Sequence, residues 1–254
     1  MGQSPCKGPV SLLVRGAARK LVAYGAISTP KVLLRNLERV ATIIESGPIL
    51  GERMSTSTAD SFTAADNFRQ LAERVLFRDP PSIDEDSTAK PASLGDYDLN
   101  PGILPDPAQI LPPKPAAVLI PILATTPLSV LLTVRSDHLP NHAGQISFPG
   151  GKLEERDAGP AAAAMREADE EIGLDPRFIE PVGFLDWYRT GSGYVISPLV
   201  ALIKPGYTLN ADPGEVTDIF EVPLPFLLDV ANHQRHSRIS RGRQKHFYAM
   251  TYGE

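Results

Sequence analysis

The chain has 254 residues, of which 42% are hydrophobic and 22% charged, proportions typical of a soluble globular protein with a sizeable core. Residues 1–53 carry a charge of +5 (eight Lys or Arg against three Asp or Glu), so the rest of this −5 chain carries −10, which argues against a nucleic acid or an anionic membrane as partner. The only cysteine is Cys6 and no apolar run has membrane-spanning length, so we expect a cytoplasmic protein without disulfides, a Cys-based zinc site or a transmembrane helix.

The basic segment 1–53 has three interpretations. Residues 32–44 have apolar positions at helical spacing, which is typical of an amphipathic helix and also of an Arg-rich targeting presequence. The third interpretation is an extension upstream of the natural start, which Met54 would mark because the composition changes abruptly there. We favour this third interpretation.

Regular structure is expected from residue 61 onward. The apolar spacing predicts an amphipathic helix over 61–77, and the Pro-, Asp- and Ser-rich stretch 78–115 predicts a linker that packs on the following domain. We then expect strands at 116–123, 129–135, 145–148, 178–188, 194–203 and 215–222, a short helix at 223–230 and a hairpin of 234–238 with 246–250. Strands interleaved with one strong helix indicate an α/β (α+β) sandwich over 116–254, not a doubly wound sheet.

The strong helix follows a double glycine, Gly150-Gly151. We expect Asp157 to cap its N-terminus, Pro160 to occupy an early position and Gly173 to end it in the left-handed conformation. Apolar residues three and four apart predict its buried face, formed by Ala161, Ala164, Met165, Ala168 and Ile172.

The acidic end of this helix is the unusual feature of the chain. Glu167, Glu170 and Glu171 lie at i, i+3 and i+4, where like charges repel, and acidic groups in a last turn oppose the helix macrodipole. Three carboxylates converging on one face would form a hard oxygen cage for Mg²⁺ or Mn²⁺. The glycines at 150 and 151 permit close approach, so a backbone carbonyl could join the cage. The alternative is a solvated acidic face that binds nothing.

The stretch 151–174 resembles the Nudix box, whose pattern is Gly, five residues, Glu, seven residues, then Arg-Glu-apolar-x-Glu-Glu-x-Gly-apolar. Residues 166–174, which read Arg-Glu-Ala-Asp-Glu-Glu-Ile-Gly-Leu, match the second half without a gap. In the first half Asp157 stands where Glu is expected, and eight residues instead of seven separate it from Arg166.

This one-residue shift resembles the Nudix branch that contains the coenzyme A pyrophosphatases. Residues 131–136 (LLTVRS), 142–145 (HAGQ) and 147–151 (SFPGG) resemble the second signature of that branch. The resemblance covers about residues 116–253 and implies a Nudix-type α/β/α sandwich with a mixed central sheet and one catalytic helix. The family continues past the final strand into a closing helix, which we expect to be missing because this sequence ends at residue 254.

The resemblance implies metal-dependent hydrolysis of coenzyme A or acyl-CoA to 4′-phosphopantetheine, or its acyl form, and adenosine 3′,5′-bisphosphate, with Mg²⁺ or Mn²⁺ as cofactor. The position of Asp157 and the 131–136 signature favour coenzyme A over ADP-ribose or a dinucleoside polyphosphate, the substrates of an alternative Nudix hydrolase. A catalytically silent Nudix-fold module that binds nucleotide or protein is a third hypothesis, and the intact glutamate set argues against it. The enzyme hypotheses imply a small nucleotide as partner, and the sequence does not decide whether the protein forms a homodimer.

The family pattern implies roles for individual residues. Glu167, Glu170 and Glu171 would be the metal ligands, with Glu170 and Glu171 the most committed to catalysis. Arg166 would pair with Asp157 or with a helix carboxylate, and would orient groups instead of reacting itself.

Residues outside the box receive roles from the same resemblance. A carboxylate from a later loop is often recruited, and Glu215 is the candidate for an additional ligand or base, with a plain strand-end charge as the alternative. Arg135 is the candidate for the 3′-phosphate of coenzyme A, outside the metal cage, because a guanidinium fork suits phosphate; a structural salt bridge is the alternative. His142 would hydrogen-bond substrate or fix its loop, and Gly150 and Gly151 would border the substrate.

Overall fold

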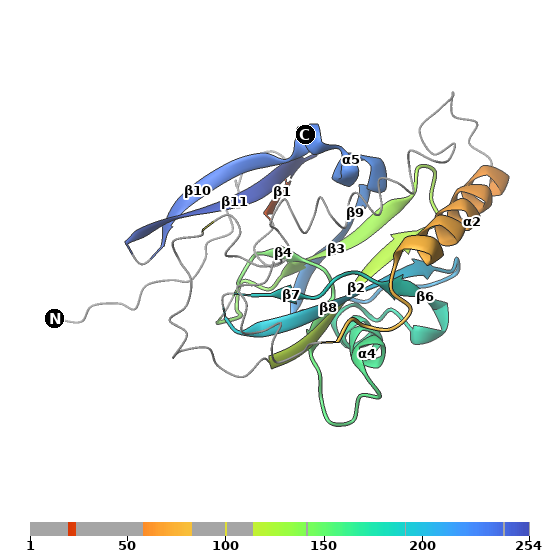
Figure 1. The fold of residues 1–254 in the computed structure, drawn as a ribbon, viewed down its shortest axis with the longest axis horizontal. Helices are drawn as coiled ribbons and strands as arrows, with labels where there is room; N and C mark the ends of the chain where they lie inside the picture. The colour runs from red at the N-terminus through yellow and green to blue at the C-terminus, as the bar shows by residue number, and fades with distance from the viewer. Residues whose placement is uncertain are drawn as a thin grey trace.

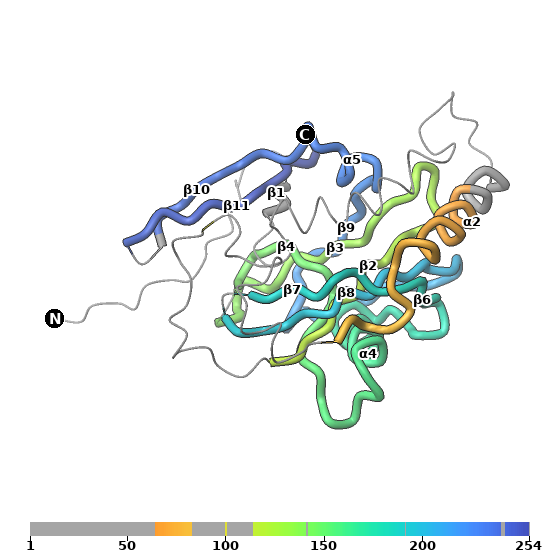
Figure 2. The backbone as a smooth tube through the Cα atoms, viewed as in Figure 1, coloured from red at the N-terminus to blue at the C-terminus, as the bar shows by residue number. Residues whose placement is uncertain are grey.

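The structure is a computed structural model that describes residues 20–23, 58–82, 100 and 114–253, apart from single positions at 141, 191 and 241. Figure 2 shows in grey the residues whose placement is uncertain. The helix considered for 32–44 and most of the linker 78–115 lie outside the described residues. Within the described part, no helix is both long and apolar enough to cross a membrane.

The predicted elements are present, with small shifts at their ends. The helices are α2 (Thr58–Val75), α4 (Pro160–Ile172) and α5 (Leu224–Leu228), with short 3₁₀ turns η4 (Pro176–Phe178) and η5 (Val230–Asn232). The larger sheet contains β2 (Lys114–Leu123), β3 (Ser129–Arg135), β4 (Ile146–Ser147), β5 (Gly150–Lys152), β6 (Ile179–Phe184), β7 (Tyr188–Arg189), β8 (Tyr194–Ile203) and β9 (Val216–Pro223). The smaller sheet contains β1 (Lys20–Ala23), β10 (Gln234–Ser240) and β11 (Arg243–Tyr252).

The larger sheet is mixed, and its strand order is β4-β3-β2-β8-β6. At its centre β2 and β8 run parallel, from Lys114 opposite Tyr194 to Leu123 opposite Ile203. The remaining pairs are antiparallel, including β5 with β2, β7 with β8 and β9 with β3. The structure thus confirms the predicted mixed central sheet.

Helices cover both faces of this sheet, because apolar side chains alternate along its central strands. On one face Leu119 of β2 and Leu199 of β8 are buried with Ala164 of α4. On the other face Ile120 of β2 is buried with Phe68 of α2. Figure 1 shows the two helices at separate sides of the strands. This layering confirms the α/β/α sandwich.

Helix α2 is an integral part of that sandwich. Its Arg69 donates a hydrogen bond through Nε to Glu180 of β6 at 2.7 Å. At Gly183, also in β6, an added Cβ would lie 2.7 Å from Cβ of Leu76, closer than side chains approach in proteins. The helix is therefore docked by one ion pair and one glycine that permits close packing.

The smaller sheet combines the two ends of the chain. The predicted hairpin is confirmed, with β10 and β11 paired from Gln234 opposite Ala249 to Ser240 opposite Arg243. Strand β1 pairs antiparallel with the other edge of β11, a pairing that the sequence did not predict. Figure 1 shows this sheet on the side of the molecule away from α4. At least residues 20–23 of the basic segment 1–53 thus contribute backbone to the fold.

Candidate active site

Helix α4 is anchored by small residues and by its C-terminal glycine. Ala163, Ala164 and Ala168 are fully buried against the sheet, while the predicted Ala161 and Met165 are only partly buried. Gly173 takes the left-handed conformation (φ 66°), as predicted, and its N–H bonds to carbonyls of the last turn. The alanines permit close packing of helix on sheet, which fixes the register of the acidic residues.

The predicted N-cap is wrong. The N-cap position is Gly159, which makes no side-chain cap. Asp157 instead accepts hydrogen bonds from Nε and Nη2 of Arg166 at 2.9 and 3.0 Å and from the N–H of Glu154 at 2.8 Å. The guanidinium of Arg166 lowers the pKa of Asp157 to about 2. A bidentate pair with the partly buried Arg166 has replaced the cap.

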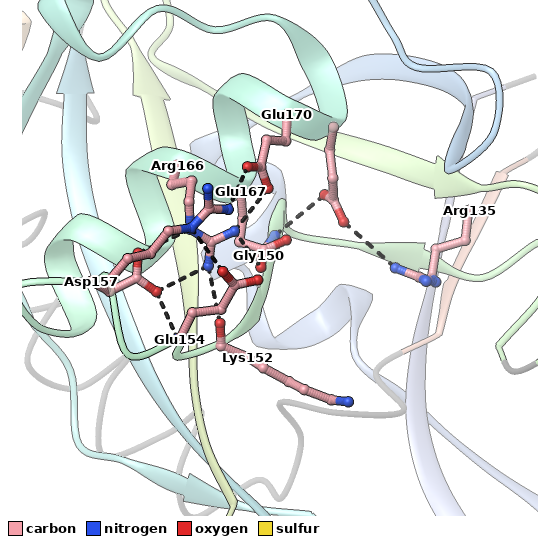
Figure 3. Close-up of polar contacts among 10 residues, drawn as sticks. Arg135, Gly150, Lys152, Glu154, Asp157, Arg166, Glu167 and Glu170 are labelled. Atoms are coloured by element: carbon pink, nitrogen blue, oxygen red, sulfur yellow. Dashed lines mark hydrogen bonds and ion pairs between the residues drawn. The ribbon is translucent and has the colours of Figure 1, made fainter.

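Arg166 is the organising cation of the site (Figure 3). Besides Asp157, its Nη2 donates to the carbonyl of Lys152 at 3.1 Å. Its Nη1 donates to Glu167 at 3.0 Å and to Glu170 at 2.7 Å. These contacts, above all the hydrogen bonds to Asp157, raise the pKa of Arg166. Arg166 therefore pairs with both partners that the sequence offered as alternatives, and it orients the two glutamates.

The three glutamates differ in exposure. The side chain of Glu171 is 3% exposed, that of Glu167 is 16% and that of Glu170 is 49%. Among the described residues, no group of three or more acidic, His or Cys side chains is arranged to hold a metal ion. The convergence expected from spacing is therefore not seen in this arrangement. Each glutamate instead pairs with an arginine, Glu167 and Glu170 with Arg166 and Glu171 with Arg135.

Glu171 is the buried member of the set. The N–H of Gly150 donates to its Oε2 at 3.3 Å, and Nη1 of Arg135 lies 3.6 Å from its Oε1. Burial raises the pKa of Glu171 to about 8, and Arg135 lowers this pKa only in part. Because the Arg135 charge offsets the desolvation of the Glu171 carboxylate only in part, this carboxylate is suited to bind a divalent cation.

Glu167 lies against the double glycine. A Cβ added at Gly151 would overlap its carboxylate, so the glycine is needed for this approach. Burial raises the pKa of Glu167, and the negative charges of Glu170 and Glu215 raise it further. The charge of Glu215 also raises the pKa of Glu171, so Glu215 acts electrostatically on both glutamates.

Glu215 is thus brought to the site from the loop before β9. Its carbonyl accepts a hydrogen bond from the N–H of Ser136 at 2.7 Å. This bond ties the loop to the end of β3, next to Arg135. The position agrees with the predicted ligand or base, and the role itself stays a prediction.

The predicted substrate residues are divided between the site and its rim. Arg135 lies beside Glu171, at the carboxylates, and not outside the cage as we expected for a 3′-phosphate contact. His142 is exposed, has φ 60° and contacts Oε1 of Gln145 through Nδ1 at 2.8 Å. That contact fits the loop-fixing alternative, and Gly150 reaches the site through its N–H instead of a carbonyl.

Two residues at the site, Arg156 and Glu154, were not predicted from the sequence. Arg156 bonds Oε1 of Glu170 at 3.0 Å and is held in turn by Glu154 at 2.7 Å. Both lie in the loop between β5 and α4, which is one residue longer than the general Nudix pattern. The extra residue indicates in the sequence that this loop is unusual. Only the folded structure shows that the loop places Arg156 next to Glu170.

These residues fit a divalent cation. The donor set consists of carboxylate oxygens, which Mg²⁺ and Mn²⁺ prefer. Glu167 and Glu171 both have raised pKa values because they are buried, and Glu215 adds a third negative charge nearby. A cation between them would offset both the desolvation and the mutual repulsion.

Comparison with known proteins decides the family. The NUDIX domain family model matches residues 113–240, about half of the chain. A Nudix hydrolase, NudL of Photorhabdus laumondii, itself uncharacterized, is 38% identical over 151 residues, which cover 56% of this chain and 81% of that protein. Its namesake in Escherichia coli K12 is 40% identical over 129 residues, covering 51% and 67%. The chain belongs to the Nudix family. As a Nudix hydrolase, this protein acts on a nucleoside diphosphate derivative. Nudix hydrolases generally use divalent metal ions.

Solved structures with similar folds are also Nudix proteins. The NUDIX domain of Shewanella oneidensis NrtR, crystallised with ADP ribose, has a TM-score of 0.38 and 23% identity, covering 52% of this chain and 84% of that one. An Ap4A hydrolase of Caenorhabditis elegans has a TM-score of 0.38 and 18% identity, covering 46% and 85%.

Proposed function

We propose that this Nudix enzyme hydrolyses the diphosphate of coenzyme A or acyl-CoA, with Mg²⁺ or Mn²⁺ as cofactor. The proposal rests on a contact between a residue of the upstream signature and a residue of the Nudix box. Arg135 comes from the upstream signature 131–136, Glu171 from the Nudix box, and their side chains form an ion pair. The Asp157–Arg166 pair, at the shifted spacing of the coenzyme A branch, holds the same cluster together.

The chain's own residues supply orientation and charge for this reaction. Arg166, fixed by Asp157, holds Glu167 and Glu170 beside each other. The N–H of Gly150 holds Glu171. Glu167, Glu170 and Glu171 would hold a divalent cation, which would supply charge neutralisation of the diphosphate and a lowered pKa of the attacking water.

Glu215 is our candidate for the general base. Its negative charge acts on both Glu167 and Glu171, and its carbonyl accepts a hydrogen bond from the N–H of Ser136, which ties its loop to the end of β3. In this position it would take a proton as water attacks phosphorus and the P–O bond of the diphosphate breaks.

Two alternatives compete with this proposal. The Shewanella NUDIX domain was crystallised with ADP ribose, so a different nucleoside diphosphate is the nearest competitor. A silent binding module is disfavoured because the glutamates and the arginine that orients them are all in place.

A substrate panel separates these functions. The full chain is incubated with Mg²⁺ or Mn²⁺ and coenzyme A, acetyl-CoA, ADP-ribose or NADH, and products are identified by mass. We expect adenosine 3′,5′-bisphosphate from coenzyme A while ADP-ribose and NADH stay intact. Preferential cleavage of ADP-ribose would overturn the proposal, and no turnover of any compound would favour the silent module.

The substitution Glu170→Gln tests the glutamate set. We expect turnover to fall about 100-fold or more, the order of loss when one charged group leaves an active site. The fold should survive, because the side chain is 49% exposed. Steady-state kinetics and thermal unfolding check this, with the exposed Glu73→Gln of α2 as the matched control. Full activity in Glu170→Gln would show that the metal assignment is wrong.

A further inference from the structure

Two guanidinium groups at the cluster are held very differently. Arg166 is fixed by two hydrogen bonds to Asp157 and one to the carbonyl of Lys152, all within 3.1 Å. Arg135 makes one ion pair, with Nη1 3.6 Å from Oε1 of Glu171. Its Nε is buried and has no hydrogen-bond partner among the described residues. Arg166 therefore belongs to the scaffold, whereas the side chain of Arg135 can change partner.

The backbone of Arg135, in contrast, is firmly placed. Its N–H donates to the carbonyl of Gln145 at 2.8 Å, and the N–H of Ser136 donates to the backbone carbonyl of Glu215 at 2.7 Å. The pairing of β3 with β9 shifts register between Val134 and Arg135, and such irregularities redirect side chains near active sites. The backbone of Arg135 is thus fixed beside the carboxylates, whereas its guanidinium is held by a single ion pair (Figure 3).

Arg135 and a metal ion would compete for the same carboxylate. The side chain of Glu171 is 3% exposed, and within the described part of the chain its one other polar partner is the N–H of Gly150. A cation bound at Glu171 would take over the charge that Arg135 now balances, and it would repel the guanidinium at this short range. The displaced guanidinium keeps five donors and needs an anion. The diphosphate of the substrate is the anion that the reaction brings to this place.

We propose that Arg135 pairs with Glu171 only while the site holds no metal, and that metal binding turns its guanidinium to the diphosphate of the substrate. Arg135 would then couple the two ligands: metal binding prepares the anion site and, by reciprocity, the diphosphate tightens metal binding. This inference rests on the diphosphate chemistry of the proposed function, but not on coenzyme A as the substrate.

The coupling can be measured with ADP as the probe. Calorimetry on the full chain gives the affinity for ADP with and without Mg²⁺. In Arg135→Gln we expect the affinity without Mg²⁺ to stay within about twofold of wild type, because Arg135 is then engaged by Glu171. With Mg²⁺ we expect a loss of about tenfold or more, the effect of one charge-assisted contact. Arg177→Gln is the matched control, since its side chain is 73% exposed and pairs with Asp175; it should change neither affinity.

Two results would overturn the inference. An equal loss of ADP affinity with and without Mg²⁺ would make Arg135 a permanent anion contact, and no loss in either condition would make its ion pair purely structural. A measurement on the wild type guards against a variant that fails to fold. The ¹⁵N resonance of Arg135 Nε should shift when Mg²⁺ is added and again with ADP, while that of Arg177, which pairs with Asp175, stays in place. An unchanged Arg135 resonance also overturns it.

Failure of the substrate proposal is distinguishable from failure of this one. If coenzyme A is not hydrolysed but Arg135→Gln loses the Mg²⁺-dependent gain in ADP affinity, the substrate assignment fails and the coupling role stands. If coenzyme A is hydrolysed and the gain persists in Arg135→Gln, the coupling role fails alone.

Discussion

At the scale of single residues, one missing side chain decides where Glu167 lies. The carboxylate occupies the space that a Cβ at Gly151 would need. We expect Gly151→Ala to displace it and to weaken Mg²⁺ binding about 10-fold or more, as for other changes that disturb ligand orientation. Calorimetric titration with Mg²⁺ measures this. Gly242→Ala, at φ 72° with open space around it, should cost stability through backbone strain but leave the affinity intact; a parallel loss in both variants would contradict the steric explanation.

The pair Asp157–Arg166 gives a prediction for acid stability. The pKa of Asp157 is lowered from 3.8 to about 2 in the folded protein, so its contribution is complete above about pH 4 and is lost as the pH falls toward 2. We expect Asp157→Asn to lower the free energy of unfolding by about 1–2 kcal/mol at pH 7, after allowance for solvent screening. Near pH 3 the difference from wild type should be about half as large.

Urea unfolding at pH 7 and pH 3 checks this dependence. Asp79→Asn, an exposed carboxylate outside the pair, serves as the control and should show no comparable change with pH. A difference between wild type and Asp157→Asn that is the same at both pH values would show that the ion pair does not stabilise the fold.

At the scale of elements, α2 lies before the residues that match the family yet contributes to the core. Phe68 is 1% exposed and packs among buried residues of the sheet. We expect Phe68→Ala to lower the free energy of unfolding by about 3–5 kcal/mol, the usual cost of such a cavity. The exposed Glu73→Ala on the same helix should change it by less than about 0.5 kcal/mol. Chemical denaturation measures both, and similar values would mean that α2 is only loosely attached.

Helix α4 shows which boundaries a sequence can define. Pro160 and Gly173 are local signals that act through backbone geometry, and both were predicted correctly. Asp157 was misassigned as the cap because its partner, Arg166, is nine residues away and a bidentate arginine outcompetes a free N–H. The buried face was right for Ala164, but spacing alone did not show that Glu171 would be buried with it.

At the scale of the whole molecule, β1 covers an edge of the C-terminal hairpin. Its residues pair with β11 from Lys20 opposite Tyr252 to Ala23 opposite Ala249. Removing residues 1–53 would expose that edge, and unpaired edges promote association between chains. We expect the shortened protein to aggregate more readily, as measured by light scattering. Its Mg²⁺ affinity should be unchanged, because α4 packs on the larger sheet and β1 pairs in the smaller one. Unchanged solubility would show that the β1 pairing is dispensable.

The family, most of the strands and helices between residues 58 and 252, and the set of acidic residues could be predicted from the sequence alone, because these depend on local spacing and periodicity. The partners follow from the tertiary structure: Arg166 pairs with Asp157, Arg156 with Glu170, and Arg135 with Glu171. Such contacts join residues up to tens of positions apart, and they depend on how the sheet places β3, β5 and the loop before β9 around α4. Burial, which follows from the same packing, is what separates the three equivalent-looking glutamates into a buried, a half-buried and an exposed carboxylate.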